Sequence, residues 1–302
     1  MRLFPCLLLI AHAVADPLPP RVEPQAAVTE AQPEEAGRKV WHTRFFRIDS
    51  DLEIRPNDLA SLAQVADTTA TVLKAHPLPF FAPPRGQRSR ISIHADAADY
   101  VRAGGFHGTA GFYVASQAEV LLRGDFFTEG PEKRLLPPHY DEDILVHELV
   151  HLCMHRVNPR LPQWLIEGIA EYFACVHQGG GRFSFADIDH AVRDHLRSRL
   201  SPDDPSIPLV PVADIAAIRG RGWLRYVEGM APEDRYQAYA TALLLAHYQI
   251  HGGQLRMAAL RKHLENDGAP ALLVPEDSFK IQEALTRFWK SKRLTLEFAK
   301  SS

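Results

Sequence analysis

The sequence predicts an α+β protein with a small mixed sheet in its N-terminal part, a helical C-terminal part and one distinctive helix at their junction. Three observations lead to this prediction. Alternation of apolar and polar residues, which is typical of strands, is found between residues 45 and 122. Apolar residues at helical spacing dominate after residue 141. The chain also contains no internal repeat.

The elements are expected to form one domain over residues 41–302, in three consecutive parts. The part at 41–140 carries a strand at 45–48, a helix at 59–74, a strand at 90–94 and a hairpin of strands at 110–114 and 118–122. Two helices that carry the motif described below occupy 141–177. In the last part, 178–302, helices are expected at 186–200, 214–218, 232–250, 255–264 and 278–288.

Composition and charge suit one large globular domain. Of the 302 residues, 46% are hydrophobic and 24% are charged, so the chain can bury a sizeable core. The formal net charge of −3 gives no reason to expect a nucleic-acid partner. The basic residues that cluster near the C-terminus, Lys290, Lys292 and Arg293, are interpreted as a solvated helix end.

The first forty residues are expected to precede the folded domain. Residues 1–15 combine Arg2, a short apolar run and small residues at 13–15, which predicts a signal peptide. This run is shorter than the roughly 20 residues that span a bilayer, so we expect a secreted or periplasmic protein whose mature chain is not inserted in a membrane. Residues 16–40, rich in Pro, Ala and Glu, predict a flexible leader.

The sequence HELVH at 147–151 is the most informative motif of the chain. Asp141 can cap its helix, on which His147 and His151 lie one turn apart on the same face. Two imidazoles at that spacing can bind one Zn²⁺ at about 2.0–2.1 Å each. Glu148 is offset from His147 by about 100°, so it can flank the metal and act as a base on a water whose pKa zinc lowers to about 7.

A second helix carries the sequence WLIEGIAE at 164–171. Glu167 and Glu171 are four residues apart and share one face of this otherwise apolar helix. Buried carboxylates need partners, because an uncompensated buried charge is unfavourable. A metal ion and a metal-bound histidine would supply both partners, so the two motifs together predict a metal site.

The two motifs together resemble those of the gluzincin metallopeptidases, the thermolysin-like clan, and in particular the bacterial "peptidase MA-like" extracytoplasmic proteins. The motif similarity covers about 141–176. The resemblance implies a thermolysin-like zincin fold, one Zn²⁺ per chain held by His147, His151 and Glu167, and Glu148 as the general base. Glu171 would then hydrogen-bond a ligand histidine, with His147 expected. The spacing from His151 alone favours Glu171 as the third ligand, whereas the surrounding Trp-Leu-x-Glu-Gly pattern favours Glu167.

One further histidine and two pairs of residues lie in or near the two motifs. His155 continues the row of histidines but is expected at the helix end or cleft rim, because it is about 6 Å further along the axis. Cys153 and Cys175 either form a disulfide or remain two buried thiols. Met154 and Val157 occupy the places where a metzincin has its glycine and third histidine, which excludes that class.

The resemblance also implies a donor that stabilises negative charge on the substrate's carbonyl oxygen. Tyr239 is the expected donor; Tyr226, Tyr236 and His247 are also suitably placed in the sequence, and Tyr239 is equally compatible with a core position. The expected function is a zinc endopeptidase acting on a peptide or protein, which could bind along a sheet edge at 110–114 or 118–122. The alternatives are an inactive zinc-binding scaffold and a zinc hydrolase of a non-peptide envelope amide or ester.

Overall fold

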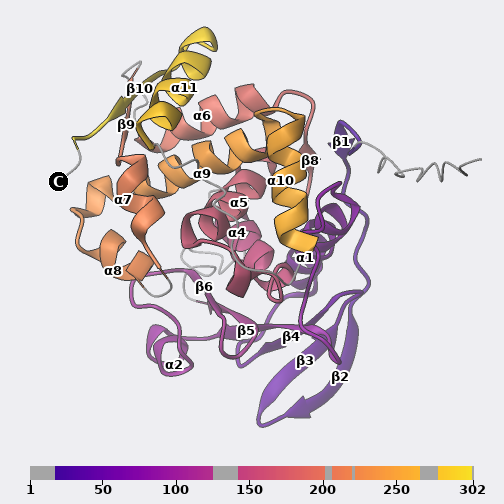
Figure 1. The fold of residues 1–302 in the computed structure, drawn as a ribbon. Helices are drawn as coiled ribbons and strands as arrows, with labels where there is room; N and C mark the ends of the chain where they lie inside the picture. The colour runs from indigo at the N-terminus through magenta and orange to yellow at the C-terminus, as the bar shows by residue number, and fades with distance from the viewer. Residues whose placement is uncertain (1–17, 125–141, 201–205, 220–221, 266–277, 301–302) are drawn as a thin grey trace, which may run out of the picture.

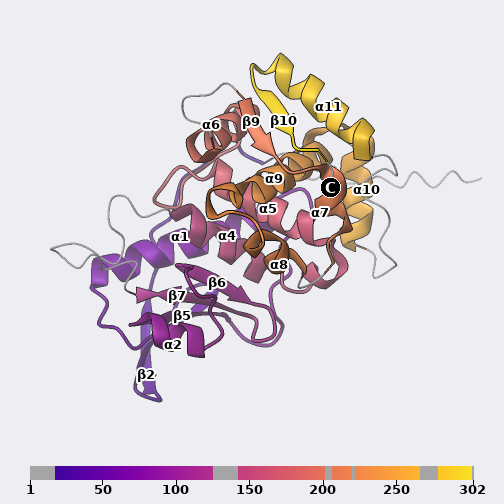
Figure 2. The ribbon, with the colours of Figure 1, turned by 90° about the vertical axis from the view of Figure 1, so that its left-hand side faces the viewer.

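The computed structural model describes residues 18–124, 142–200, 206–219, 222–265 and 278–300. These residues form a mixed α/β fold in which a six-stranded mixed sheet lies at one end and a group of helices at the other (Figure 1). A view turned by 90° shows the same division, with α4 Glu142–Cys153 and α5 Gln163–Val176 between the sheet and the outer helices (Figure 2). The prediction of an N-terminal sheet and a helical C-terminal part is therefore confirmed for the described residues.

The sheet has the strand order β2-β3-β4-β5-β7-β6. Its strands are β2 Glu30–Glu35, β3 Arg38–His42, β4 Phe46–Ser50, β5 Ser89–His94, β6 Gly111–Val114 and β7 Glu119–Arg123. The strands β4, β5 and β7 are parallel, and the neighbours at each side are antiparallel. The expected strands at 45–48 and 90–94 and the hairpin at 110–122 are thus confirmed, and β6 forms an edge of the sheet.

One face of the sheet belongs to the main hydrophobic core. Ile48, Ile91 and Val120 are fully buried there, in one cluster with the apolar residues of α1 Pro56–Ala75 and α4 Glu142–Cys153. The helix expected at 59–74 lies within α1. This helix begins at Pro56, and a proline in the first turn costs no amide hydrogen bond.

The opposite face is more polar. The buried carboxylate of Asp49 contacts Arg38 on β3 and Arg90 and Ser92 on β5, which supply the ion pairs and hydrogen bonds that a buried charge needs. Nearer to β6, the short helix α2 Ala97–Arg102 covers this face with Tyr100. Polar and apolar side chains thus alternate along these strands, because successive side chains of a strand point to opposite faces of the sheet.

The helical part is built around α5 Gln163–Val176, which packs against α4 and against α9 Tyr236–His251. The other helices are α6 Ile188–Leu200, α7 Val212–Ala217, α8 Gly222–Glu228, α10 Gln254–Glu265 and α11 Ser278–Ser291, with short 3-10 turns at Asn158–Arg160 and Pro232–Asp234. Two small sheets pair β9 Ser206–Leu209 with β10 Thr295–Phe298 and β1 Arg21–Val22 with β8 Phe183–Ser184. The five helices expected after residue 178 are all present, whereas α8 was not predicted.

The prediction of a flexible leader at 16–40 is wrong for the described part of that range. β1, β2 and most of β3 lie within it. A polar strand at a sheet edge is held by backbone hydrogen bonds to its neighbour and does not need an apolar face. Pro33 is compatible with this position because the strand is an edge and its register shifts between Gln32 and Glu35.

Two other predictions concern residues outside the described ranges. The signal peptide at 1–15 lies there, and so does the capping residue Asp141. Within the described ranges, no helix combines the length and the apolar character needed to cross a membrane.

Cys153 and Cys175 are both buried and both carry free thiols. Of the two alternatives, the structure therefore shows separate thiols. Cys175 lies near the end of α5, where the following His177 contacts Asp143 at the start of α4. Cys153 is at the other end of α4, about 15 Å from Asp143 along the helix axis at 1.5 Å per residue. A disulfide needs Cα atoms within about 7 Å of each other, so the two cysteines are too far apart to pair.

Candidate metal centre

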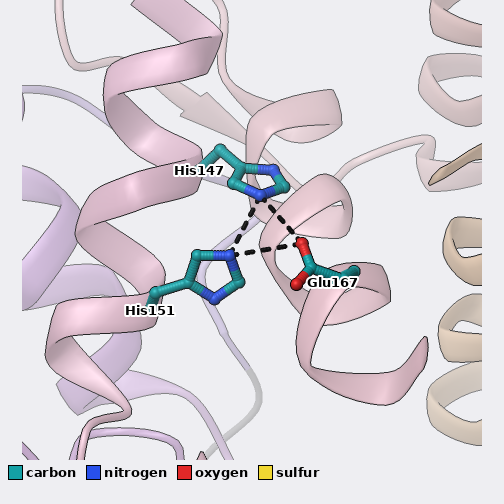
Figure 3. Close-up of side chains that lie close together, drawn as sticks. All are labelled: His147, His151 and Glu167. Atoms are coloured by element: carbon teal, nitrogen blue, oxygen red, sulfur yellow. Dashed lines mark hydrogen bonds and ion pairs between the residues drawn. The ribbon is translucent and has the colours of Figure 1, made fainter. Parts of the chain in front are cut away.

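Three side chains from α4 and α5 meet at the junction of the sheet and the helices. The Nε2 atoms of His147 and His151 are 3.0 Å apart, and Oε2 of Glu167 lies 3.3 Å from the first and 3.4 Å from the second (Figure 3). All three residues are buried. The helical spacing of the two histidines and the packing of α5 against α4 bring these atoms together.

This triangle of atoms fits a metal ion. Ligand atoms about 2.0–2.1 Å from a tetrahedral zinc are separated from one another by about 3.3 Å, which matches the three distances observed. The ligand atoms of His147, His151 and Glu167 can together hold a metal ion. Imidazole and carboxylate donors suit zinc, and also other divalent transition metals.

Hydrogen bonding at His147 supports the same interpretation. Its Nδ1 lies 2.8 Å from Oε1 of Glu171, which accepts the N–H of a neutral ring. Nε2 then carries a lone pair, which faces the carboxylate of Glu167. Two acceptors at this distance repel each other unless a cation lies between them, so the geometry calls for a proton or a metal ion there.

The pKa shifts have the sign that a site for a cation requires. Burial lowers the pKa of His147, but hydrogen bonds to Glu167 and Glu171 outweigh it and raise that pKa well above its ordinary value. Burial raises the pKa of Glu167, but the two histidines outweigh it and hold that pKa far below the usual range. Positive charge between these groups is therefore strongly favoured.

The structure separates the roles of the two glutamates. Glu167 faces the Nε2 atoms of both histidines, whereas Glu171, one turn further along α5, faces Nδ1 of His147. Their order along the helix thus follows the Trp-Leu-x-Glu-Gly pattern and not the spacing from His151. A carboxylate on the far nitrogen of a ligand histidine fixes the tautomer and the orientation of the ring.

Glu148 lies beside the ligand atoms and outside their triangle. Its Oε2 accepts a hydrogen bond of 2.8 Å from the backbone amide of Tyr113 on the edge strand β6. Gly111 on the same strand also lies next to Glu148, since a Cβ atom there would be 3.4 Å from Cγ of this glutamate. Glu148 is only partly buried, unlike the three ligand candidates.

The edge strand contributes a second contact through the side chain of Tyr113. Its ring stacks on His151 at a centroid distance of 5.8 Å, and its hydroxyl lies 2.6 Å from Nδ1 of His155. His155 is thus near the end of the motif helix and outside the ligand set, where the sequence placed it. Nδ1 of His151 is buried without a hydrogen-bond partner in the described part of the chain, so stacking and helix packing orient this ring.

Of the four residues considered as donors to the substrate, Tyr239 lies against a ligand candidate. Its ring centroid is 6.1 Å from that of His147, and Trp223 packs on its edge. Burial, followed by the nearby carboxylates, raises the pKa of Tyr239, so its hydroxyl keeps its proton. His247 pairs with Asp189, away from the ligands.

Tyr236 and His195 have a role at the site that the sequence did not reveal. Tyr236 donates a hydrogen bond of 2.6 Å to Oε2 of Glu171, and Nε2 of His195 lies 2.7 Å from the Tyr236 oxygen. His195 is on α6, outside both motifs, and no local pattern distinguishes it from other helical histidines.

Comparison of the chain with the models of known protein families gives no match, and comparison with curated proteins gives none either.

Proposed function

We propose that the protein is a zinc-dependent metallopeptidase of the gluzincin type that cleaves internal peptide bonds outside the cytoplasm. The observation that carries this proposal is the convergence of His147, His151 and Glu167 with Glu148 beside them but not among them. A site that served only to stabilise the fold would not require a carboxylate next to an open ligand position. The location rests on the signal-like sequence at 1–15.

The roles of the residues follow from their contacts. Zinc bound by His147, His151 and Glu167 would lower the pKa of a water to about 7 and polarise a carbonyl group. Glu148 would accept the proton of the attacking water and pass it to the leaving amine. Tyr239, which keeps its proton, would donate a hydrogen bond to the oxygen on which negative charge develops.

Strand β6 is the element that would bind an extended peptide. The carbonyl of Ala110 accepts a hydrogen bond from Arg123 on β7, whereas the amide of Tyr113 points to Glu148 on the other side. The edge strand therefore runs next to the proposed base. Of the two sheet segments considered for substrate pairing, only β6 is an edge, because β7 lies between β5 and β6.

Metal analysis and a peptide library together test the proposal. The wild-type protein should bind about one zinc per chain, and His147→Ala should lose it because two protein ligands rarely hold zinc. Glu148→Gln should keep the metal and lose hydrolysis by at least about 100-fold, the usual contribution of a general base. Full zinc occupancy in His147→Ala would refute the site.

The library also separates the alternatives. A wild type that binds zinc and cleaves no peptide, but hydrolyses an envelope amide or ester, would assign the same residues to a different substrate. A wild type that binds zinc and hydrolyses none of these would favour an inactive scaffold. Glu148→Gln serves as the matched control in each assay because it changes one atom of the proposed base.

A further inference from the structure

Glu171 is held by more residues than its contact with the metal ligand requires. Its Oε1 faces Nδ1 of His147 at 2.8 Å, while its Oε2 accepts the Tyr236 hydroxyl at 2.6 Å and lies 3.3 Å from Nε2 of His195. The donors come from three helices: α4 carries His147, α6 carries His195 and α9 begins at Tyr236. Elements far apart in sequence thus meet at one carboxylate.

The hydrogen-bond donors in this group can be assigned in only one consistent order. A carboxylate is an acceptor only, so both His147 Nδ1 and the Tyr236 hydroxyl donate to Glu171. The hydroxyl has a single proton, and therefore Nε2 of His195 must carry a proton and donate to the Tyr236 oxygen. Each donor in this series of hydrogen bonds is therefore directed toward Glu171.

Burial and a neighbouring arginine maintain the hydrogen bonds between His195, Tyr236 and Glu171. Burial, followed by the charge of Glu171, raises the pKa of Tyr236 well above its ordinary value, so the phenol stays protonated and remains a donor. The guanidinium of Arg199 lies over the Tyr236 ring, 5.3 Å from its centroid. Arg199 also pairs with Asp143 at the start of the motif helix, which links this cover to α4.

We propose that Tyr236 and His195 are positioning residues that set the metal affinity of the site by holding Glu171 against His147. This inference rests on the metal centre of the proposed function, though not on peptide cleavage. Glu171 fixes the tautomer that leaves Nε2 of His147 free for the metal. A carboxylate that lost its donors on Oε2 would rotate or take up water, and His147 would then be less well oriented.

The test is the zinc dissociation constant, measured by competition with a chromophoric chelator. Tyr236→Phe removes one hydroxyl and should weaken zinc binding about tenfold, the lower end of the effect of outer hydrogen-bond partners on metal affinity. Tyr248→Phe is the matched control: it removes a hydroxyl from the same helix, but one that accepts a hydrogen bond from Arg256 instead of contacting Glu171. The control should bind zinc as the wild type does.

His195 offers a rescue experiment. His195→Leu removes the donor to Tyr236 and should also weaken zinc binding, whereas His195→Gln places an amide N–H where Nε2 stood and should restore most of the affinity. Thermal unfolding of the zinc-free variants measures any loss of packing independently. If the network only stabilised the fold, the midpoints of the zinc-free proteins would fall while zinc affinity stayed unchanged.

Cobalt substitution supplies a spectroscopic measurement. The visible bands of the Co²⁺-loaded protein report ligand geometry, so Tyr236→Phe and His195→Leu should shift them, and Tyr248→Phe should not. Unchanged zinc affinity and unchanged bands in both variants would overturn the inference. A wild type that binds no zinc would overturn it together with the metal centre. A wild type that binds zinc but cleaves nothing would count only against the proposed activity, and the affinities would still decide on the positioning residues.

Discussion

At the scale of single residues, the site depends on which nitrogen of His147 keeps its proton. Nδ1 of His147 keeps its proton and donates a hydrogen bond to Glu171, and this leaves the lone pair of Nε2 directed at Glu167 and His151. Glu167 and Glu171 have the same side chain and lie one turn apart on one helix, yet they contact opposite nitrogens of this ring. Their roles are therefore set by position relative to α4 and not by chemistry of their own.

Tyr239 gives a prediction at this scale. Its ring lies against His147, and it makes none of the hydrogen bonds to Glu171 that Tyr236 makes. Tyr239→Phe should therefore lower kcat by about 100- to 1000-fold, as removal of one donor to a developing oxyanion does, with KM and zinc affinity little changed. Steady-state kinetics with a peptide from the library measure the effect.

A result that would contradict this role is a Tyr239→Phe protein with normal kcat. The ring would then be ordinary core packing next to a ligand, the alternative that the sequence left open. Zinc affinity measured on the same preparation shows whether any loss of turnover comes instead from loss of metal.

At the scale of elements, the close contact of α5 with α9 positions the helix that carries Glu167, one of the candidate metal ligands. Gly168 directly follows Glu167, and a Cβ atom at that position would lie 2.2 Å from the carbonyl oxygen of Ala242 on α9. No real Cβ approaches a backbone oxygen so closely. The glycine of the Trp-Leu-x-Glu-Gly pattern is thus needed for helix packing, in addition to any role in the motif.

Gly168→Ala should destabilise the protein by about 1–3 kcal/mol, the range found for overpacked cores. Alanine favours a helix over glycine by about 1 kcal/mol, but the clash with backbone forces the helices apart and outweighs this gain. Because Glu167 is the preceding residue, zinc affinity should fall as well. Urea unfolding and zinc competition measure the two effects.

Gly229→Ala is the matched control for this substitution. A Cβ atom there would lie 3.4 Å from the nearest carbonyl oxygen, an ordinary contact, and the residue is exposed just after α8. Its stability should stay within about 0.5 kcal/mol of the wild type. If Gly168→Ala were equally mild, the close helix contact would not limit the choice of residue.

The length of an element and the burial of its side chains decide whether it can be predicted from a single sequence. Long segments with one apolar face, such as α1 and α11, were predicted because burial selects their pattern. The strand β2 was not predicted, since an edge strand is held by backbone hydrogen bonds that place little demand on its side chains. Short helices display little periodicity: α2 and α8, of six and seven residues, were not predicted, whereas α7, of six residues, was.

At the scale of the whole molecule, a partly buried histidine makes stability depend on pH. The side chain of His76, at the end of α1, packs against the rings of Phe80 and Phe173. Burial lowers the pKa of His76 from 6.5 to about 3. Between these values the unfolded chain binds the proton and the folded chain does not, so the free energy of unfolding falls as the pH drops from 6.5 toward 3.

His76→Gln should flatten this part of the pH profile and keep an acceptor for the amide of Leu78. Thermal unfolding is best measured on zinc-free protein, because acid also releases metal from histidine ligands. His107→Gln, which changes an exposed loop residue, controls for the loss of a histidine. An unchanged slope in His76→Gln would mean that other groups cause the acid sensitivity.

The identities and relative directions of the candidate site residues at the junction follow from the sequence. His147, Glu148 and His151 lie on one regular helix, so their relative directions follow from 3.6 residues per turn and need no further information. The same holds for Glu167 and Glu171 on α5. Which glutamate faces which nitrogen is seen in the folded chain, because it depends on how far α5 is displaced along α4. The tertiary structure also brought in Tyr113, His195 and Tyr236, which come from other elements and reach the site through packing of the whole chain.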